Sequence, residues 1–157
     1  MSTKRTRKGG WADPKHLPRG PNGRGLCRYC GAEVPPRRSS FCSAACVHEW
    51  KLQTDPGYLR EQVFHRDKGY CALCQTDTMR VFGWLRRLRG SVRAKALSEW
   101  GLNGLTRLSL WDADHIVPVV EGGGECDLSN IRTLCLKCHR KMTGELRKRR
   151  VASAHSA

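Results

Sequence analysis

The sequence predicts a small, zinc-stabilised α+β fold, in which an inserted pair of helices and a ββα unit follow a small four-cysteine module. Three observations lead to this prediction. The chain has 157 residues, which suffice for one ordinary domain or for two small ones with added stabilisation. Eight of its nine cysteines occur as four close pairs. Towards the C-terminus, two short apolar stretches flank a glycine-rich segment and precede a basic helical segment.

The charge balance favours nucleic acid as the partner. The chain has 29 Lys and Arg residues against 14 Asp and Glu residues, which gives a net charge of +15. This excess is spread over the whole length, as in proteins that bind a polyanion. No apolar run approaches the length of a transmembrane helix, and no basic segment has an apolar face beside it. A membrane is therefore not expected as the partner.

The N-terminal segment, residues 1–25, is expected to be a disordered basic arm, because it is rich in Gly, Pro and basic residues and has no hydrophobic period. It could add weak, salt-sensitive DNA contacts or act only as a linker. It also lacks the apolar core of a signal peptide. The expected location is intracellular: cytoplasmic if the source is prokaryotic or a phage, and nuclear if it is eukaryotic.

The first cysteine group occupies residues 26–54. Cys27 and Cys30 are two residues apart, and Cys42 and Cys46 follow at the start of an expected short helix. Close pairs in a reducing compartment indicate zinc rather than disulfides. Four thiolates at this spacing can surround one tetrahedral zinc ion. The sequence therefore predicts a structural zinc that replaces a core too small to hold itself.

Three helices are expected next, at Tyr58–Asp67, Met79–Leu88 and Val92–Trp100. Arg86 and Arg87 are expected to face outward, either as a solvated surface or towards DNA, and the net charge favours DNA. The side chains expected to pack are Trp84, Leu85, Leu88, Leu97 and Trp100.

A second zinc site is expected within residues 55–150. Cys71 and Cys74 leave zinc half-coordinated, so they need two further ligands. The remaining close pair is Cys135 and Cys138. A second structural zinc that joins the two pairs would hold together the ends of this domain. The ninth cysteine, Cys126, is assigned no role.

The ββα unit is expected from Leu110 to about residue 150, with residues 151–157 as a tail. Leu110–Val117 and Ile131–Leu134 are apolar stretches that fit two strands, and a glycine-rich loop joins them. From about Cys138 the sequence continues as a basic helix. Its expected DNA contacts are Arg140, Lys141, Arg147 and Lys148.

Four polar residues in this unit predict phosphodiester chemistry. Adjacent side chains on a strand point to opposite faces, so Asp114 and His115 are expected to act separately. Asp114 is predicted to bind a hard cation such as Mg²⁺ or Mn²⁺, with His139 as a second ligand. His115 is predicted to take a proton from the attacking water. Asn130 is expected either to orient His115 across the hairpin or to reach the metal.

The segment from Phe41 to about Arg150 resembles the HNH nucleases, and within that family the HNH module of a Snf-type annealing helicase that carries a Ran-binding zinc finger. The motifs that carry the resemblance are Phe41-Cys-Ser, Tyr58-Leu-Arg, Val63-Phe64, Cys71-x-Leu-Cys74, Asp114-His115-Ile-x-Pro, the glycine loop and Leu134-Cys-x-x-Cys-His139. The resemblance implies a ββα-metal core and DNA endonuclease activity with one divalent cation. It also implies that His115 is the base, that Asp114 and His139 bind the metal, and that Asn130 supports the site. Some members have a further ligand four residues after the last His, where this chain has Thr143.

The expected function is therefore a metal-dependent DNA endonuclease of low sequence specificity, acting on duplex or branched DNA as a monomer or homodimer. Two alternatives remain. One is a zinc-stabilised DNA-binding adaptor without cleavage activity, although such an adaptor needs none of the four polar residues. The other is an RNA-binding zinc protein, for which aromatic stacking platforms would be expected.

Overall fold

The computed structural model describes residues 12–155, which divide into two compact units with their boundary between Arg60 and Glu61. The first unit contains a short 3₁₀ helix, η1 (Pro14–His16), and helix α1 (Ala44–Thr54), and helix α2 (Pro56–Asp67) runs from the first unit into the second. Within residues 12–155, no helix combines the length and the apolar character needed to cross a bilayer.

Residues 12–25 differ from the disordered arm expected there. Asp13 caps η1 by accepting a hydrogen bond from the Lys15 amide at 3.0 Å. Further along, Glu33 accepts hydrogen bonds from the backbone N–H of Asn22 at 2.8 Å and from its side-chain amide at 2.6 Å. These polar contacts order the segment without a hydrophobic period, which is why the sequence pattern did not indicate them. The rest of the expected arm, residues 1–11, lies outside the described residues.

The two helices near the unit boundary start at side-chain caps. Ser43 caps α1 and accepts from the Cys46 amide at 3.1 Å, which fixes the backbone of this cysteine beside Cys42. Asp55 accepts from the amides of Gly57 and Tyr58 at 2.9 and 3.1 Å, and Pro56 occupies the first position of α2. The caps explain why α2 begins so soon after α1 ends.

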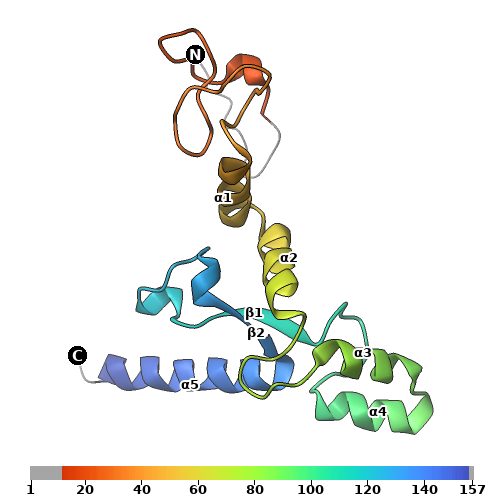
Figure 1. Ribbon diagram of the computed structural model, residues 1–157. Helices are drawn as coiled ribbons and strands as arrows, with labels where there is room; N and C mark the ends of the chain where they lie inside the picture. The colour runs from red at the N-terminus through yellow and green to blue at the C-terminus, as the bar shows by residue number, and fades with distance from the viewer. Residues whose placement is uncertain (1–11, 156–157) are drawn as a thin grey trace. The chain divides into compact units, whose positions relative to one another are not determined.

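In the second unit, helices α3 (Thr78–Arg87) and α4 (Gly90–Glu99) form the expected inserted pair (Figure 1). Asp77 caps α3 by accepting from the Arg80 amide at 2.9 Å. The expected packing residues Leu85, Leu97 and Trp100 are buried, but Trp84 is 49% exposed. The prediction for Trp84 is wrong because α3 turns Leu85, not its neighbour, towards the core.

The ββα unit consists of strands β1 (Trp111–His115) and β2 (Ile131–Cys135) and helix α5 (Leu136–His155), which lies along the sheet (Figure 1). The strands are antiparallel, with Trp111 opposite Cys135 and His115 opposite Ile131. Short 3₁₀ helices, η2 (Val119–Glu121) and η3 (Leu128–Asn130), lie in the loop between them.

Helix α5 differs from the sequence expectation at both ends. It begins at Leu136 rather than near Cys138, because buried Leu136 donates its backbone N–H to the carbonyl of Leu110 at 3.0 Å. It continues to His155 and so includes residues that were assigned to a tail. Its early start sets which side chains of its first turn face β1.

A hydrophobic core joins the helical pair to the ββα unit. Leu85, Leu110 and Leu134 are fully buried in it, together with Cys71 and Cys135. Burying such leucines contributes roughly 1.5–3 kcal/mol each. Two of the cysteines are thus part of a core that the leucines also build.

Polar contacts from α2 fix the start of β2. Arg66 donates to the carbonyls of Leu128 at 2.6 Å and Ile131 at 2.5 Å, and its Nε pairs with Asp67 at 2.6 Å. Asp67 in turn accepts from the Thr133 amide at 3.0 Å. The carbonyl of Ile131 and the amide of Thr133 are therefore held by two adjacent side chains of α2, while the carbonyl of Thr133 accepts from the Ala72 amide at 2.8 Å.

Candidate metal centres and active site

Two groups of four cysteines are assembled as the sequence predicts, and each could bind a zinc ion. Within each group the sulfur atoms all lie within 4.8 Å of one another. This separation suits four thiolates around one tetrahedral ion. The first group is Cys27, Cys30, Cys42 and Cys46, and the second is Cys71, Cys74, Cys135 and Cys138.

In the first group, the hydrogen bonds favour one thiolate. Burial raises the pKa of the Cys27 thiol, but backbone N–H groups of Cys30 and Cys42 donate to it and lower the pKa to about 6. The hydrogen bonds that Cys42 makes with Cys46 and Cys30 raise its own pKa to about 12. The lowered pKa favours the thiolate of Cys27, which is the form that binds a metal cation.

The second group follows the same pattern. Burial raises the pKa of the Cys74 thiol, but hydrogen bonds with the hydroxyl and the backbone of Thr76 lower it to about 6. Burial, followed by the hydrogen bond with Cys74, raises the pKa of Cys138. Both groups therefore contain one cysteine whose pKa is lowered and another whose pKa is raised.

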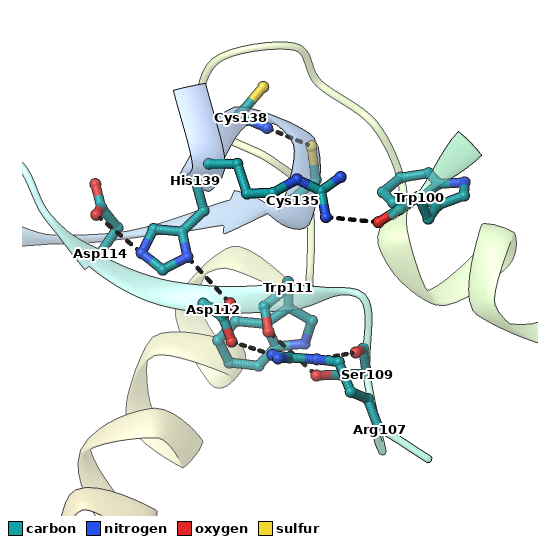
Figure 2. Close-up of polar contacts among 10 residues, drawn as sticks. Trp100, Arg107, Ser109, Trp111, Asp112, Asp114, Cys135, Cys138 and His139 are labelled. Carbon is teal, nitrogen blue, oxygen red and sulfur yellow. Dashed lines mark hydrogen bonds and ion pairs between the residues drawn. The ribbon is translucent and has the colours of Figure 1, made fainter. Parts of the chain in front are cut away.

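One residue after Cys138, His139 lies between two carboxylates of β1. Figure 2 shows its imidazole between Asp112 and Asp114. Its Nδ1 is 3.1 Å from an oxygen of Asp112, and its Nε2 is 3.7 Å from an oxygen of Asp114. The two carboxylates share this face because they are two positions apart on a strand. His139 and Asp114 are thus brought together as the sequence predicts.

Asp112 is a site residue that the sequence reasoning missed. It accepts from His139 and also pairs with Arg107, which in addition donates to the Ser109 carbonyl at 3.4 Å (Figure 2). The alternation of Asp112, Ala113 and Asp114 was the available signal, because it places both carboxylates on one face. Such an arrangement fixes the imidazole and leaves its Nε2 directed at Asp114.

His115 lies on the opposite face of β1 from Asp114 and contacts the glycine-rich loop. Its Nε2 is 2.9 Å from the carbonyl oxygen of Glu125. A carbonyl only accepts hydrogen bonds, so this ring nitrogen carries the proton, and Nδ1 keeps its lone pair. The loop thus selects the tautomer of His115.

Asn130 closes the loop between the strands. Its side-chain oxygen accepts from the Val117 amide at 2.9 Å, and its side-chain nitrogen donates to the carbonyls of Val117 and Gly124, each at 3.0 Å. Its backbone carbonyl accepts from Ile116 at 2.7 Å. Of the two roles expected for Asn130, these contacts correspond to support of the backbone next to His115, and they reach His115 only through that backbone.

A small pocket connects the two faces of the site. Asp114 and His115 both line it, together with Arg132 and Arg149. Arg132 donates to Asp114 at 3.2 Å, and Arg149 pairs with Glu121 of the loop at 3.3 Å. The carboxylate and the imidazole therefore share a pocket with two guanidinium groups.

The basic residues expected to contact DNA are all exposed, but one has an internal role. Arg140 donates to the carbonyl of Trp100 at 2.7 Å and thereby links α5 to the end of α4. The others, which face solvent, are Arg86, Arg87, Lys141, Arg147 and Lys148.

Comparisons with known proteins agree with this geometry. A sequence model of the family described as HNH endonuclease matches residues 102–145. The mouse and human DNA annealing helicase and endonuclease ZRANB3 are 35% and 34% identical to this chain over 82% and 76% of its length. The chain spans only 14% and 13% of those relatives.

A solved structure is similar as well. The human ZRANB3 HNH domain superposes with a TM-score of 0.50 at 32% identity, and the match covers 66% of this chain and 98% of that domain. The matched family segment contains both strands and the first half of α5, and therefore includes Asp114, His115, Asn130 and His139. The chain therefore belongs to the HNH endonuclease family.

Proposed function

We propose that this chain is a metal-dependent DNA endonuclease that hydrolyses phosphodiester bonds with low sequence specificity. The observation that carries the proposal is the placement of His139 between Asp112 and Asp114, beside a pocket that also contains His115. The relatives are named DNA annealing helicase and endonuclease, which supports DNA as the substrate.

The donor set fits one divalent cation. Asp114 and His139 would hold it, because their nearest oxygen and nitrogen atoms are 3.7 Å apart and both can face the same ion. Carboxylate oxygen with one imidazole suits Mg²⁺ or Mn²⁺. When bound, the ion would offset negative charge on the phosphate and on the leaving oxygen.

Asp112 would position His139 rather than bind the ion. Its carboxylate accepts a hydrogen bond from Nδ1–H of His139, which leaves Nε2 as the atom that would bind the ion. This arrangement is common around metal-binding histidines. Arg107 keeps Asp112 in place by pairing with its other oxygen. His139 is thus held in place by Asp112, which is in turn held by Arg107.

His115 would act as the general base. Its Nδ1 keeps a lone pair because Nε2 donates to the Glu125 carbonyl, and Asn130 holds the loop on which that carbonyl lies. Arg132 and Arg149 would attract the scissile phosphate into the pocket that His115 lines. A water molecule between the phosphate and His115 could then lose its proton to the imidazole.

The two four-cysteine groups would each hold a structural zinc ion. Closed tetrahedral thiolate sites leave no open position for a substrate, so these ions would stabilise the fold without taking part in cleavage. The second zinc would fix the first turn of α5, where Cys138 immediately precedes His139.

The test uses zinc-loaded protein and supercoiled plasmid with Mg²⁺ or Mn²⁺. The wild type should nick the plasmid, and His115→Ala should reduce the rate by about 10²–10⁴-fold, as for loss of a general base. His65→Ala is the matched control, because His65 is an exposed histidine on α2. It should cleave like the wild type.

DNA binding separates this proposal from the adaptor. His115→Ala should retain the gel shift of the wild type, since the substitution leaves the arginines of the site intact. Absence of cleavage with either ion in the wild type, with the gel shift retained by both proteins, would contradict the nuclease and support a DNA-binding adaptor.

A further inference from the structure

We propose that the inserted helical pair carries a second DNA-phosphate site, separate from the pocket around His115. This site, the arginine groove, is lined by three arginines, three apolar residues and one threonine: Arg86, Arg93, Arg107, Phe82, Leu105, Leu108 and Thr106. The inference rests on the proposed function, because it assumes that the polyanion bound at the active site is DNA.

The composition of the helical pair supports an anionic ligand. Residues 78–111 contain seven Lys and Arg residues and a single acidic one, Glu99. The three arginines of the groove come from three separate segments, α3, α4 and the stretch before β1, and converge on one hollow of about 390 Å³. Arg107 already pairs with Asp112, which leaves Arg86 and Arg93 uncompensated. Bringing these two cations together is unfavourable unless an anion compensates them.

Structural ion pairing does not explain the positions of Arg86 and Arg93. Among residues 12–155, neither Arg86 nor Arg93 forms an ion pair with a carboxylate, and the residues that line the groove include no acidic one. The guanidinium of Arg86 lies 6.0 Å from the centre of the Phe82 ring, a contact that does not neutralise its charge. Their donors are therefore available to phosphate oxygens.

The groove is adjacent to the catalytic centre. Arg107 lines the groove and also pairs with Asp112, the carboxylate that accepts from His139. DNA carries one charge per roughly 1.7 Å of helix axis, so a duplex seated on the active site presents further phosphates to any basic surface beside it. Leu108, which also lines the groove and is 94% exposed, would be available to contact the sugar faces between phosphates.

The matched pair of variants is Arg86→Ala with Arg93→Ala, against Arg80→Ala with Lys95→Ala. Each double variant removes two positive charges, one from α3 and one from α4, but Arg80 and Lys95 are exposed and lie outside the groove lining. Arg107 is left unchanged because it supports Asp112. All variants are made in the His115→Ala background, so that binding is measured without cleavage.

Binding of a fluorescent 20-base-pair duplex is measured by anisotropy from about 50 to 200 mM salt. The groove variant should bind at least 10-fold more weakly at 100 mM salt, and its slope of log K against log salt should fall by about 2, since each phosphate that the protein no longer neutralises removes about 0.9 from the slope. The Arg80 and Lys95 variant should change the slope by less than half as much. Equal weakening in both variants, or unchanged binding in the groove variant, would overturn the proposal.

Two further measurements keep the outcomes distinct. Zinc content and thermal unfolding of each variant show whether the fold is intact. If the groove variant unfolds, the single changes Arg86→Ala and Arg80→Ala, both at exposed positions of α3, give the same comparison.

The outcomes also separate the groove proposal from the nuclease proposal. If the wild type never cleaves but the groove variant binds DNA more weakly, the nuclease function fails and the groove proposal is supported. If the wild type cleaves DNA and the groove variant binds DNA as well as the wild type, the nuclease function is supported and the groove proposal fails.

Discussion

The two four-cysteine groups share one local design but lie in different surroundings. In each, the first cysteine donates its amide to a carbonyl five residues later, Cys27 to Ala32 at 2.7 Å and Cys71 to Thr76 at 3.0 Å. Each knuckle also places the residue after its second cysteine in the left-handed region, Gly31 at φ 74° and Gln75 at φ 58°. The backbone geometry is therefore set by the ligand spacing alone.

The surroundings differ in how much apolar surface they bury. In the first unit, the buried residues are few and small, with Val34 and Leu52 as the larger members. The second group instead lies in a continuous core with Leu85, Leu110 and Leu134. A zinc ion would therefore replace a core in the first unit, whereas in the second it would complete a core and orient the helix that carries His139.

The largest expected effect comes from removing one ligand of each group. Cys30→Ser and Cys74→Ser are matched, because both cysteines are exposed and are the second of their knuckles. Each variant should bind one zinc ion rather than two, measured by metal analysis. Cys74→Ser should lose plasmid cleavage because the start of α5 is no longer fixed, while Cys30→Ser should stay close to the wild type. Equal loss of cleavage would mean that the first group also supports the catalytic unit.

A smaller effect tests whether β2 is held by more than zinc. The hydrogen bond from Arg66, opposed by burial and aided by Thr133, lowers the pKa of Asp67 below 3.8 in the folded state. The stabilisation is therefore fully present above the unfolded pKa and is lost as pH falls through the folded pKa. Asp67→Asn should lower the free energy of unfolding by about 1–3 kcal/mol at pH 7.

Urea unfolding of Asp67→Asn and the wild type at several pH values checks this. The difference between the two proteins should be constant near neutral pH and shrink below about pH 4, where the wild-type carboxylate becomes protonated. Asp127→Asn is the control, because Asp127 is an exposed aspartate whose pKa is also lowered, by Ser129. A difference that persists unchanged at low pH would show that the charge of Asp67 is not what holds β2.

The smallest effect is expected from exchanging the residue types at the two left-handed positions, Gly31 and Gln75. A non-glycine residue in this region costs roughly 1–2 kcal/mol, so Gln75→Gly should stabilise the second unit by about 1 kcal/mol after the larger chain entropy of glycine is deducted. Gly31→Gln should destabilise the first unit by a similar amount. Thermal unfolding of both zinc-loaded variants measures the change. A loss of stability in Gln75→Gly would show that the Gln75 side chain, not the backbone conformation, is what matters there.

The sequence was informative where spacing determines geometry. The two cysteine groups, the order of two strands and a helix, and the meeting of Asp114 with His139 all follow from ligand spacing and strand alternation. The roles of His115 and Asn130 stay predictions until cleavage is measured. The sequence was less informative where an outcome depends on the exact register of a helix.

Asp112 and Trp84 illustrate that limit. Strand alternation places Asp112 beside Asp114, but its pairing with His139 depends on α5 beginning at Leu136, which a hydrogen bond to a distant carbonyl decides. Trp84 and Leu85 are adjacent and are followed by two arginines. The apolar pattern of α3 therefore did not show which of the two side chains enters the core. In both cases tertiary contacts determine which side chains of the helix face the core.

The separation of the cysteine pairs also sets an order of assembly as the chain leaves the ribosome. Cys42 follows Cys30 by 12 positions, so the first group can close before the cysteines of the second group have been synthesised. Cys135 follows Cys74 by 61 positions, and His139 comes later still. The second group cannot close until Cys138 has emerged, and Asp112 and Asp114 cannot meet His139 until that residue has emerged too. A nascent chain would thus carry a finished first module well before it could damage any nucleic acid.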